Sequence, residues 1–157
     1  MKTFFEAKAG IVDLTEAPQF SNPDFGYTLF EEVIDPENPE GTRAIAMHVP
    51  GRSMSKVWQL VEPGYSERVE LLTGTANLVV QRSETEDWIT MPLDETNPTA
   101  DDVVIECGDM FCIVTDDEEA VVLSRPSKPF DKSFETGVTK TPADELSQLV
   151  LARTVRR

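Results

Sequence analysis

The chain has 157 residues, of which 39% are hydrophobic, and this is enough for one domain with a sizeable buried core. Its formal net charge of −15 creates a field that repels phosphate groups. Nucleic acid and anionic membrane surfaces are therefore excluded as expected partners.

The N-terminal segment begins like an export signal, but the charged residues Glu6, Lys8 and Asp13 interrupt the apolar stretch that such a signal needs. No segment reaches the ~20 consecutive apolar residues that span a bilayer. We therefore expect a cytoplasmic protein. Cys107 and Cys112 have no CxxC spacing for a metal or redox pair, and we expect both to be free thiols.

Residues 1–41 are rich in proline, asparagine and glycine, which interrupt helices and central strands. This composition predicts an irregular N-terminal arm with at most one short strand, around Tyr27–Ile34.

From residue 42 onward the chain changes to short runs rich in strand-forming residues, separated by turn residues. The predicted strands are Arg43–Val49, Lys56–Val61, Arg68–Leu72, Ala76–Gln81, Trp88–Met91, Asp102–Glu106, Met110–Val114 and Ala120–Ser124. Short strands at regular spacing are typical of a sandwich or barrel. Residues 42–130 are therefore predicted to form one β-barrel.

The C-terminal residues 131–157 are predicted to form a linker and one α-helix. Thr141 suits the N-cap and Pro142 the first helical position. Leu146, Leu149 and Val150 follow at helical spacing.

The segment Glu67–Gly74, followed 34 residues later by Gly108-Asp109, resembles the two conserved motifs of the cupin superfamily. The resemblance implies an all-β fold, a small double-stranded β-helix or jelly-roll barrel. Together with the flanking segments, it gives an irregular N-terminal arm, a barrel and one C-terminal helix. Barrels of this family often form homodimers, and we expect a homodimer here.

Family members use histidines of these motifs to bind a divalent metal. Counting from Gly51 places Val57 and Gln59 at the two histidine positions of the first motif, and the segment that would carry the third histidine is shortened. We therefore expect a metal-free protein that needs no cofactor.

The resemblance also indicates candidate site residues. Metal-free cupin-like epimerases and isomerases of deoxysugar nucleotides pair a histidine base with a tyrosine acid. Here this implies the lone histidine, His48, as a catalytic residue with Tyr65 or Tyr27. Such chemistry also needs arginines for a pyrophosphate, and Arg68 and Arg125 are the candidates near the motifs.

The pleat of the family barrel, applied by period-two alternation, predicts that Gln59 and Glu67 point inward and that Arg68 points outward. Glu67 then either hydrogen-bonds Gln59 or helps to orient a ligand. The six candidate site residues are His48, Tyr65, Gln59, Glu67, Arg68 and Arg125.

Two functions are compatible with these residues. The first is a metal-free cupin-like module that binds an unknown small molecule, neutral or cationic, or another partner. The alternative is a metal-independent sugar-modifying enzyme of the epimerase or isomerase type. The sequence leaves open whether the protein is catalytic.

Overall fold

A computed structural model describes residues 2–138, which are almost entirely β-structure. The strands are β1 (Phe4–Ala7), β2 (Gly10–Asp13), β3 (Gln19–Ser21), β4 (Thr28–Val33), β5 (Ala44–Val49), β6 (Trp58–Leu60), β7 (Ser66–Gly74), β8 (Ala76–Gln81), β9 (Trp88–Leu93), β10 (Val104–Glu106), β11 (Met110–Val114), β12 (Ala120–Pro126) and β13 (Glu135–Gly137). A 3-10 turn, η1 (Lys132–Phe134), precedes β13. The helix predicted after Thr141 lies outside the described residues.

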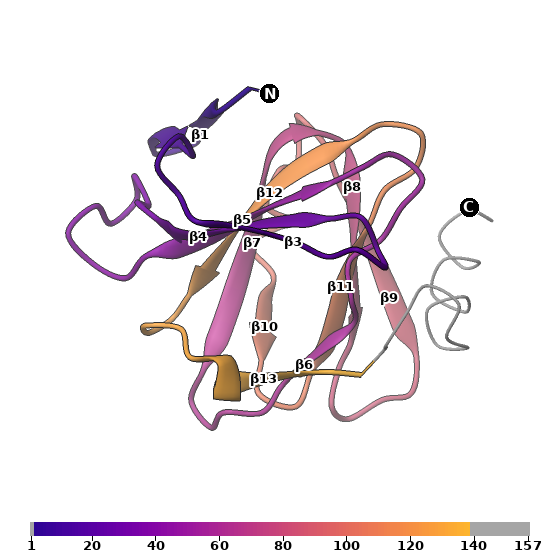
Figure 1. The fold of residues 1–157 in the computed structure, drawn as a ribbon. Helices are drawn as coiled ribbons and strands as arrows, with labels where there is room; N and C mark the ends of the chain where they lie inside the picture. Colours follow the sequence, from indigo (N-terminus) through magenta and orange to yellow (C-terminus); the bar gives the residue numbers. More distant parts are fainter. Residues whose placement is uncertain (1, 139–157) are drawn as a thin grey trace.

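The strands form two facing sheets and a separate N-terminal hairpin (Figure 1). The six-stranded sheet has the order β10-β7-β12-β5-β4-β3, and the five-stranded sheet has the order β13-β6-β11-β8-β9. Every strand pairing is antiparallel. This arrangement confirms the predicted all-β jelly roll.

The main core lies between the two sheets, where inward side chains such as Val69, Leu78 and Ile113 are almost completely buried. A second core covers the outer face of the six-stranded sheet. There Phe5 and Val12 of the hairpin pack with residues of β4, β5 and β12. Strand β12 is therefore buried on both faces, and its position is determined by two independent apolar layers.

The N-terminal forty-one residues contain four strands, and the prediction of at most one was wrong. Strands β1 and β2 are four residues each and form a hairpin in which Phe5 is paired with Val12. Each strand is too short to show a clear period, and its apolar residues find their partners on the sheet rather than in the hairpin itself. Strands β3 and β4, which precede residue 42 in the sequence, form one edge of the six-stranded sheet.

The turn residues in the sequence predicted the bounds of several strands correctly. The predicted strands Ala76–Gln81 and Met110–Val114 are confirmed at both ends. Cys107 is exposed and Cys112 is buried, and both are free thiols, as expected. No helix within residues 2–138 is long and apolar enough to cross a membrane.

Candidate functional site

A cavity of about 60 Å³ lies between the two sheets. This volume would hold about two water molecules or a small chemical group. Strands of both sheets and the segment after β12 contribute the lining residues, which are Leu29, Glu31, Ile45, Met47, Trp58, Glu67, Val69, Phe111, Ile113, Val122, Ser124, Phe130 and Glu135. An apolar and aromatic wall with a few convergent polar groups is typical of a ligand pocket.

Glu67 on β7 is the most deeply enclosed polar group of this cavity, with 4% of its surface exposed. Tyr65 donates a hydrogen bond from Oη to Oε2 of Glu67 over 2.9 Å. Ser124 on β12 donates from Oγ to Oε1 over 2.7 Å. Both carboxylate oxygens therefore have donors, as the burial of an ionised group requires.

Glu135 on β13 reaches the same cavity from the opposite sheet and is hydrogen-bonded to Glu67. Two carboxyl groups can form such a bond only when one of them keeps its proton. Burial, and secondly the negative charge of Glu67, raises the pKa of Glu135 to about 8. At neutral pH this carboxyl pair, Glu67 and Glu135, therefore holds one proton.

We assign the shared proton to Glu135, because Glu67 already accepts hydrogen bonds from two hydroxyl groups. Burial raises the pKa of Glu67, while the hydrogen bonds from Ser124, Tyr65 and Glu135 oppose that shift. Burial and the nearby Glu67 carboxylate also raise the pKa of Tyr65, so this phenol stays protonated and donates. The arrangement is one carboxylate held by three donors.

The segment of residues 127–138, here called the strap, brings Glu135 to the cavity. It leaves the end of β12 and joins the five-stranded sheet, where β13 lies beside β6 (Figure 1). Within the strap, the rings of Phe130 and Phe134 lie 6.4 Å and 5.0 Å from that of Tyr65, centroid to centroid. Val61 N also donates to the carbonyl of Phe134 over 2.8 Å. The strap therefore closes one end of the space between the sheets.

An outer groove of about 670 Å³ borders the cavity. The two spaces share Glu31, Ile45 and Phe130 as lining residues, and these three residues define the neck between them. The groove is lined by Glu31, Glu32, Gly41, Thr42, Arg43, Ala44, Ile45, Pro129, Phe130, Asp131 and Lys132. A ligand too large for the cavity alone therefore has adjacent space.

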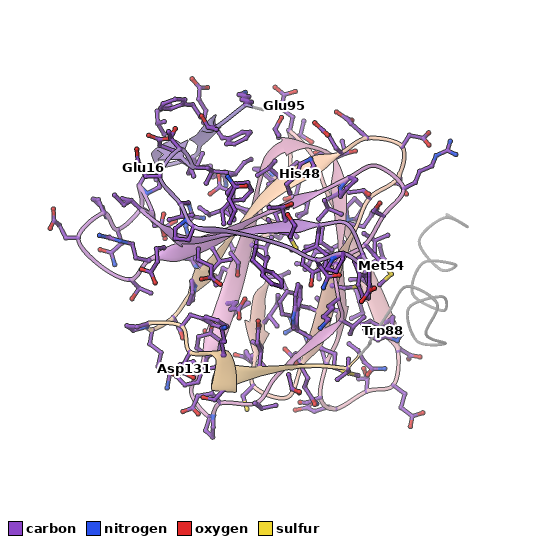
Figure 2. The ribbon with its side chains drawn as sticks, in the orientation of Figure 1. Glu16, His48, Met54, Trp88, Glu95 and Asp131 are labelled. Carbon is purple, nitrogen blue, oxygen red and sulfur yellow. The ribbon has the colours of Figure 1, made fainter. Side chains whose placement is uncertain are left out.

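The structure places Tyr65 beside Glu67, which lines the cavity, but locates His48 elsewhere. On β5, Ile45 and Met47 line the cavity, so the alternating His48 faces outward with the alanines of the outer core. Figure 2 labels His48 in the upper part of the molecule. Its Nε2 lies 3.1 Å from Oε2 of Glu119. The catalytic role of His48 stays a prediction, and this position does not bring it near Tyr65.

The predicted inward direction of Gln59 was wrong. Trp58 and Leu60 of β6 face the main core, and Gln59 turns away and donates from Nε2 to the carbonyl of Gly108 over 3.3 Å. The alternation failed because Val57 precedes β6, in a stretch of turn and irregular chain at residues 51–57. Alternation holds only along an extended backbone.

The two candidate arginines lie together on the outer side of the six-stranded sheet, where Arg68 and Arg125 are paired in register. Arg68 Nη2 is 2.7 Å from Oε1 of Glu37. Arg125 is buried and forms ion pairs with Asp35 at 2.9 Å and Glu70 at 2.7 Å. Their ligand-binding role remains a prediction, and these contacts describe a structural charge network.

Most lining residues of the cavity were not predicted as site residues, among them Glu31, Trp58, Ser124 and Glu135. Glu135 lies in a segment that was assigned to a linker, and its three-residue strand shows no period. The sequence signal for this site residue was the position of Glu135 shortly after two aromatic residues, Phe130 and Phe134. Its pairing with Glu67 depends on chain segments 68 positions apart, which local patterns do not reveal.

The positions that correspond to the family's metal histidines do not fit a metal ion. Val57 is an apolar, fully buried side chain, and the amide of Gln59 is bonded to a backbone carbonyl. Within residues 2–138 there is no group of three or more His, Cys, Asp or Glu side chains that could hold a metal.

Two facing antiparallel sheets around a small interior site define a cupin-type barrel. The fold is similar to that of the CENP-C cupin domain of Drosophila melanogaster, with a TM-score of 0.53 and 14% identity over 76% of this chain and 77% of that one. It is also similar to oxalate decarboxylase of Lactobacillus farciminis, with a TM-score of 0.58 and 11% identity over 82% of this chain.

A third similar structure is the capsular polysaccharide assembling protein CapF of Staphylococcus aureus, with a TM-score of 0.54 and 12% identity over 79% of this chain. The chain spans 32% of CapF and 36% of the decarboxylase. No protein-family model and no curated protein matches the sequence. At these identities the likeness establishes the fold alone, and the fold agrees with the resemblance of Glu67–Gly74 to a cupin motif.

Proposed function

We propose that the protein is a metal-free cupin-like binding module whose cavity takes a small molecule with a cationic amine. One observation carries this proposal: the carboxyl pair, Glu67 and Glu135, converges from two sheets in a cavity with apolar and aromatic walls. A buried carboxyl pair without a cation must hold a proton, and an ammonium group can replace that proton.

An ammonium group suits this cavity for two physical reasons. It carries several N–H donors, so it can bond to Glu67 and Glu135 at once and supply the single positive charge that the shared proton supplied before it left. The aromatic side chains of Trp58, Phe111 and Phe130 also line the cavity, and aromatic rings attract cations. The apolar remainder of the wall accommodates a short hydrocarbon body.

The charge of the whole chain supports a cationic ligand. A net charge of −15 attracts cations toward the surface and repels phosphorylated molecules. The two candidate arginines are already engaged by Asp35, Glu37 and Glu70. A pyrophosphate ligand would therefore be repelled by the net charge, and neither of these two arginines would be free to bind it.

The alternative, a sugar-modifying enzyme with His48 as base and Tyr65 as acid, requires both side chains near one substrate. Tyr65 belongs to the core between the sheets, whereas His48 faces outward from β5. This separation by a sheet argues for the binding module over the enzyme.

Isothermal titration calorimetry with butylamine and its neutral analogue butanol tests the proposed binding. Butylamine should bind with a dissociation constant on the order of 1 mM, as suits a ligand of few atoms, and butanol should bind more weakly. The substitution Glu67→Gln should weaken butylamine binding about tenfold or more, because it removes a buried charge partner. Glu84→Gln, on an exposed loop away from the cavity, is the matched control.

Proton release provides an independent measurement. Because Glu135 is largely protonated at neutral pH, butylamine binding should release nearly one proton. Titrations in two buffers with different ionisation enthalpies measure this number directly. Equal affinity for butanol and butylamine, or an unchanged affinity in Glu67→Gln, would contradict the proposal.

A further inference from the structure

Glu31 is the last inward-facing residue of β4 and lies at the neck between cavity and groove. On this strand Leu29 lines the cavity, Phe30 packs in the outer core, and Glu31 lines both spaces. Directly after it, Glu32 has a φ of 56°, and the register with β5 shifts between Phe30 and Val33. Such a bulge bends a strand and redirects its side chains.

Within residues 2–138 the carboxylate of Glu31 has no hydrogen-bond or ion-pair partner. Its backbone N–H donates to the carbonyl of Pro18, but within residues 2–138 no hydrogen bond or ion pair engages its side-chain oxygens. Other carboxylates of the barrel are paired: the partly exposed Glu62 with Lys128 and the buried Glu70 with Arg125. An unpaired carboxylate that lines a pocket is available to a ligand.

The register of the sheet sets the separation between Glu31 and the carboxyl pair. Ile45 of β5 lies beside Ser124 of β12, and Ser124 donates to Glu67. Strand β4 is the other neighbour of β5, so Glu31 and Ser124 are two strand spacings apart, on the order of 10 Å between backbones. Glu67 lies one strand further, on β7, so the backbones of Glu31 and Glu67 are three strand spacings apart, on the order of 14 Å. Because Glu31, Glu67 and Glu135 all line the same cavity, a short alkyl chain can bridge their carboxylates.

We infer that Glu31 is a second anchor of the amine site and that the ligand class is an alkyl diamine or a longer polyamine. One ammonium group contacts Glu67 and Glu135 in the cavity, and the other contacts Glu31 at the neck. This inference rests on the proposed amine-binding function. A longer polyamine continues into the outer groove, whose volume is about 670 Å³.

The groove also contains cations, and their positions are compatible with this assignment. Arg43 donates from Nη1 to the carbonyl of Pro39 over 3.3 Å, which directs it toward the loop between β4 and β5. Lys132 lines the groove together with the acidic Asp131 and Glu32. The three carboxylates of the groove, Glu31, Glu32 and Asp131, outnumber its two cations.

The experiment compares diaminobutane with butylamine, which has the same number of carbons, by calorimetry on the full chain. Wild type should bind diaminobutane about tenfold more tightly, the usual scale for one charge-assisted hydrogen bond. Glu31→Gln should lower diaminobutane affinity about tenfold and butylamine affinity by clearly less, and an unchanged melting temperature should show that the variant is folded. Glu84→Gln should behave like wild type.

The outcomes separate this inference from the function on which it rests. Equal affinity of wild type for the two amines would overturn the second anchor while the amine site stands. A loss of butylamine affinity in Glu31→Gln equal to that for diaminobutane would also overturn it, since Glu31 would then support the whole site. If neither amine binds to wild type, the proposed function itself fails.

Discussion

The substitution Glu135→Gln tests the shared proton through the stability of the protein. Glutamine keeps the shape of the side chain, and its amide can donate to Glu67, but it cannot titrate. The pKa of Glu135 is about 8 in the folded chain, against an ordinary value of 4.5. Between these values the folded protein holds a proton that the unfolded chain has lost.

The sign of the effect follows from proton linkage. A group whose pKa is raised by folding stabilises the protein fully below its unfolded pKa, and that contribution is lost as pH rises through the folded pKa. For Glu135 the window runs from 4.5 to about 8. One proton limits the slope to about −1.4 kcal/mol per pH unit, and partial exposure of Glu135 to water reduces it.

Urea denaturation at a series of pH values from about 5 to about 9 measures the free energy of unfolding. Wild type should lose stability across this range relative to Glu135→Gln, whose curve should be flatter, and Glu84→Gln should follow wild type. The lowered pKa values of Asp13, Asp94 and Asp131, caused by hydrogen bonds to neighbouring residues, act in a separate window at lower pH. Parallel curves for wild type and Glu135→Gln would refute the shared proton.

Three further predictions concern the rest of the chain. Arg125→Met should reduce the free energy of unfolding by about 3–5 kcal/mol in urea denaturation, because it leaves Asp35 and Glu70 buried without a cation; a loss below about 1 kcal/mol would contradict this. Elemental analysis should find no stoichiometric transition metal, and EDTA should leave the melting temperature unchanged. Truncation after Lys140 should lower the melting temperature or dissociate a dimer in light scattering, and a truncated protein with unchanged melting temperature and mass would show that the predicted helix does not dock.

Much of the barrel could be predicted because its strands are bounded by strong turn signals. The strand Met110–Val114 follows Gly108-Asp109, and Gly108 adopts a φ of 95°, which favours glycine. The cupin-like segment Glu67–Gly74 is confirmed as most of strand β7, which ends in Gly74 with a φ of 81°. Turn-forming residues can be recognised in a single sequence, so these strands could be predicted.

The candidate site could be predicted only in part. Tyr65 and Glu67 are close in sequence to a recognisable motif, and the inward direction of Glu67 follows from a long continuous strand. In the sequence, Glu31 precedes and Glu135 follows the predicted barrel segment, residues 42–130. Long-range strand pairing brings both residues to the cavity. Because such pairing depends on the whole fold, a local pattern could not assign these two carboxylates to the site.

The shared proton has opposite effects on the stability of the protein and on its affinity for an amine. It stabilises the ligand-free barrel, and it must leave when an ammonium group takes its place between Glu67 and Glu135. An alkyl ammonium with a pKa near that of lysine, about 10.4, stays charged through this range, so butylamine affinity should rise as pH approaches 8.

Thermal unfolding with and without saturating butylamine tests this link across the same pH range. The increase in melting temperature caused by butylamine should grow with pH up to about 8, because the ligand no longer competes with a proton. The other ionisable groups near Glu135 do not reverse this increase with pH. Tyr65 remains protonated because its pKa is raised, and Glu31, which also lines the cavity, is an acidic residue that favours a cation. In Glu135→Gln the dependence should be much weaker, since no proton has to leave. A butylamine effect that is independent of pH in wild type would mean that the amine does not replace the proton of the carboxyl pair.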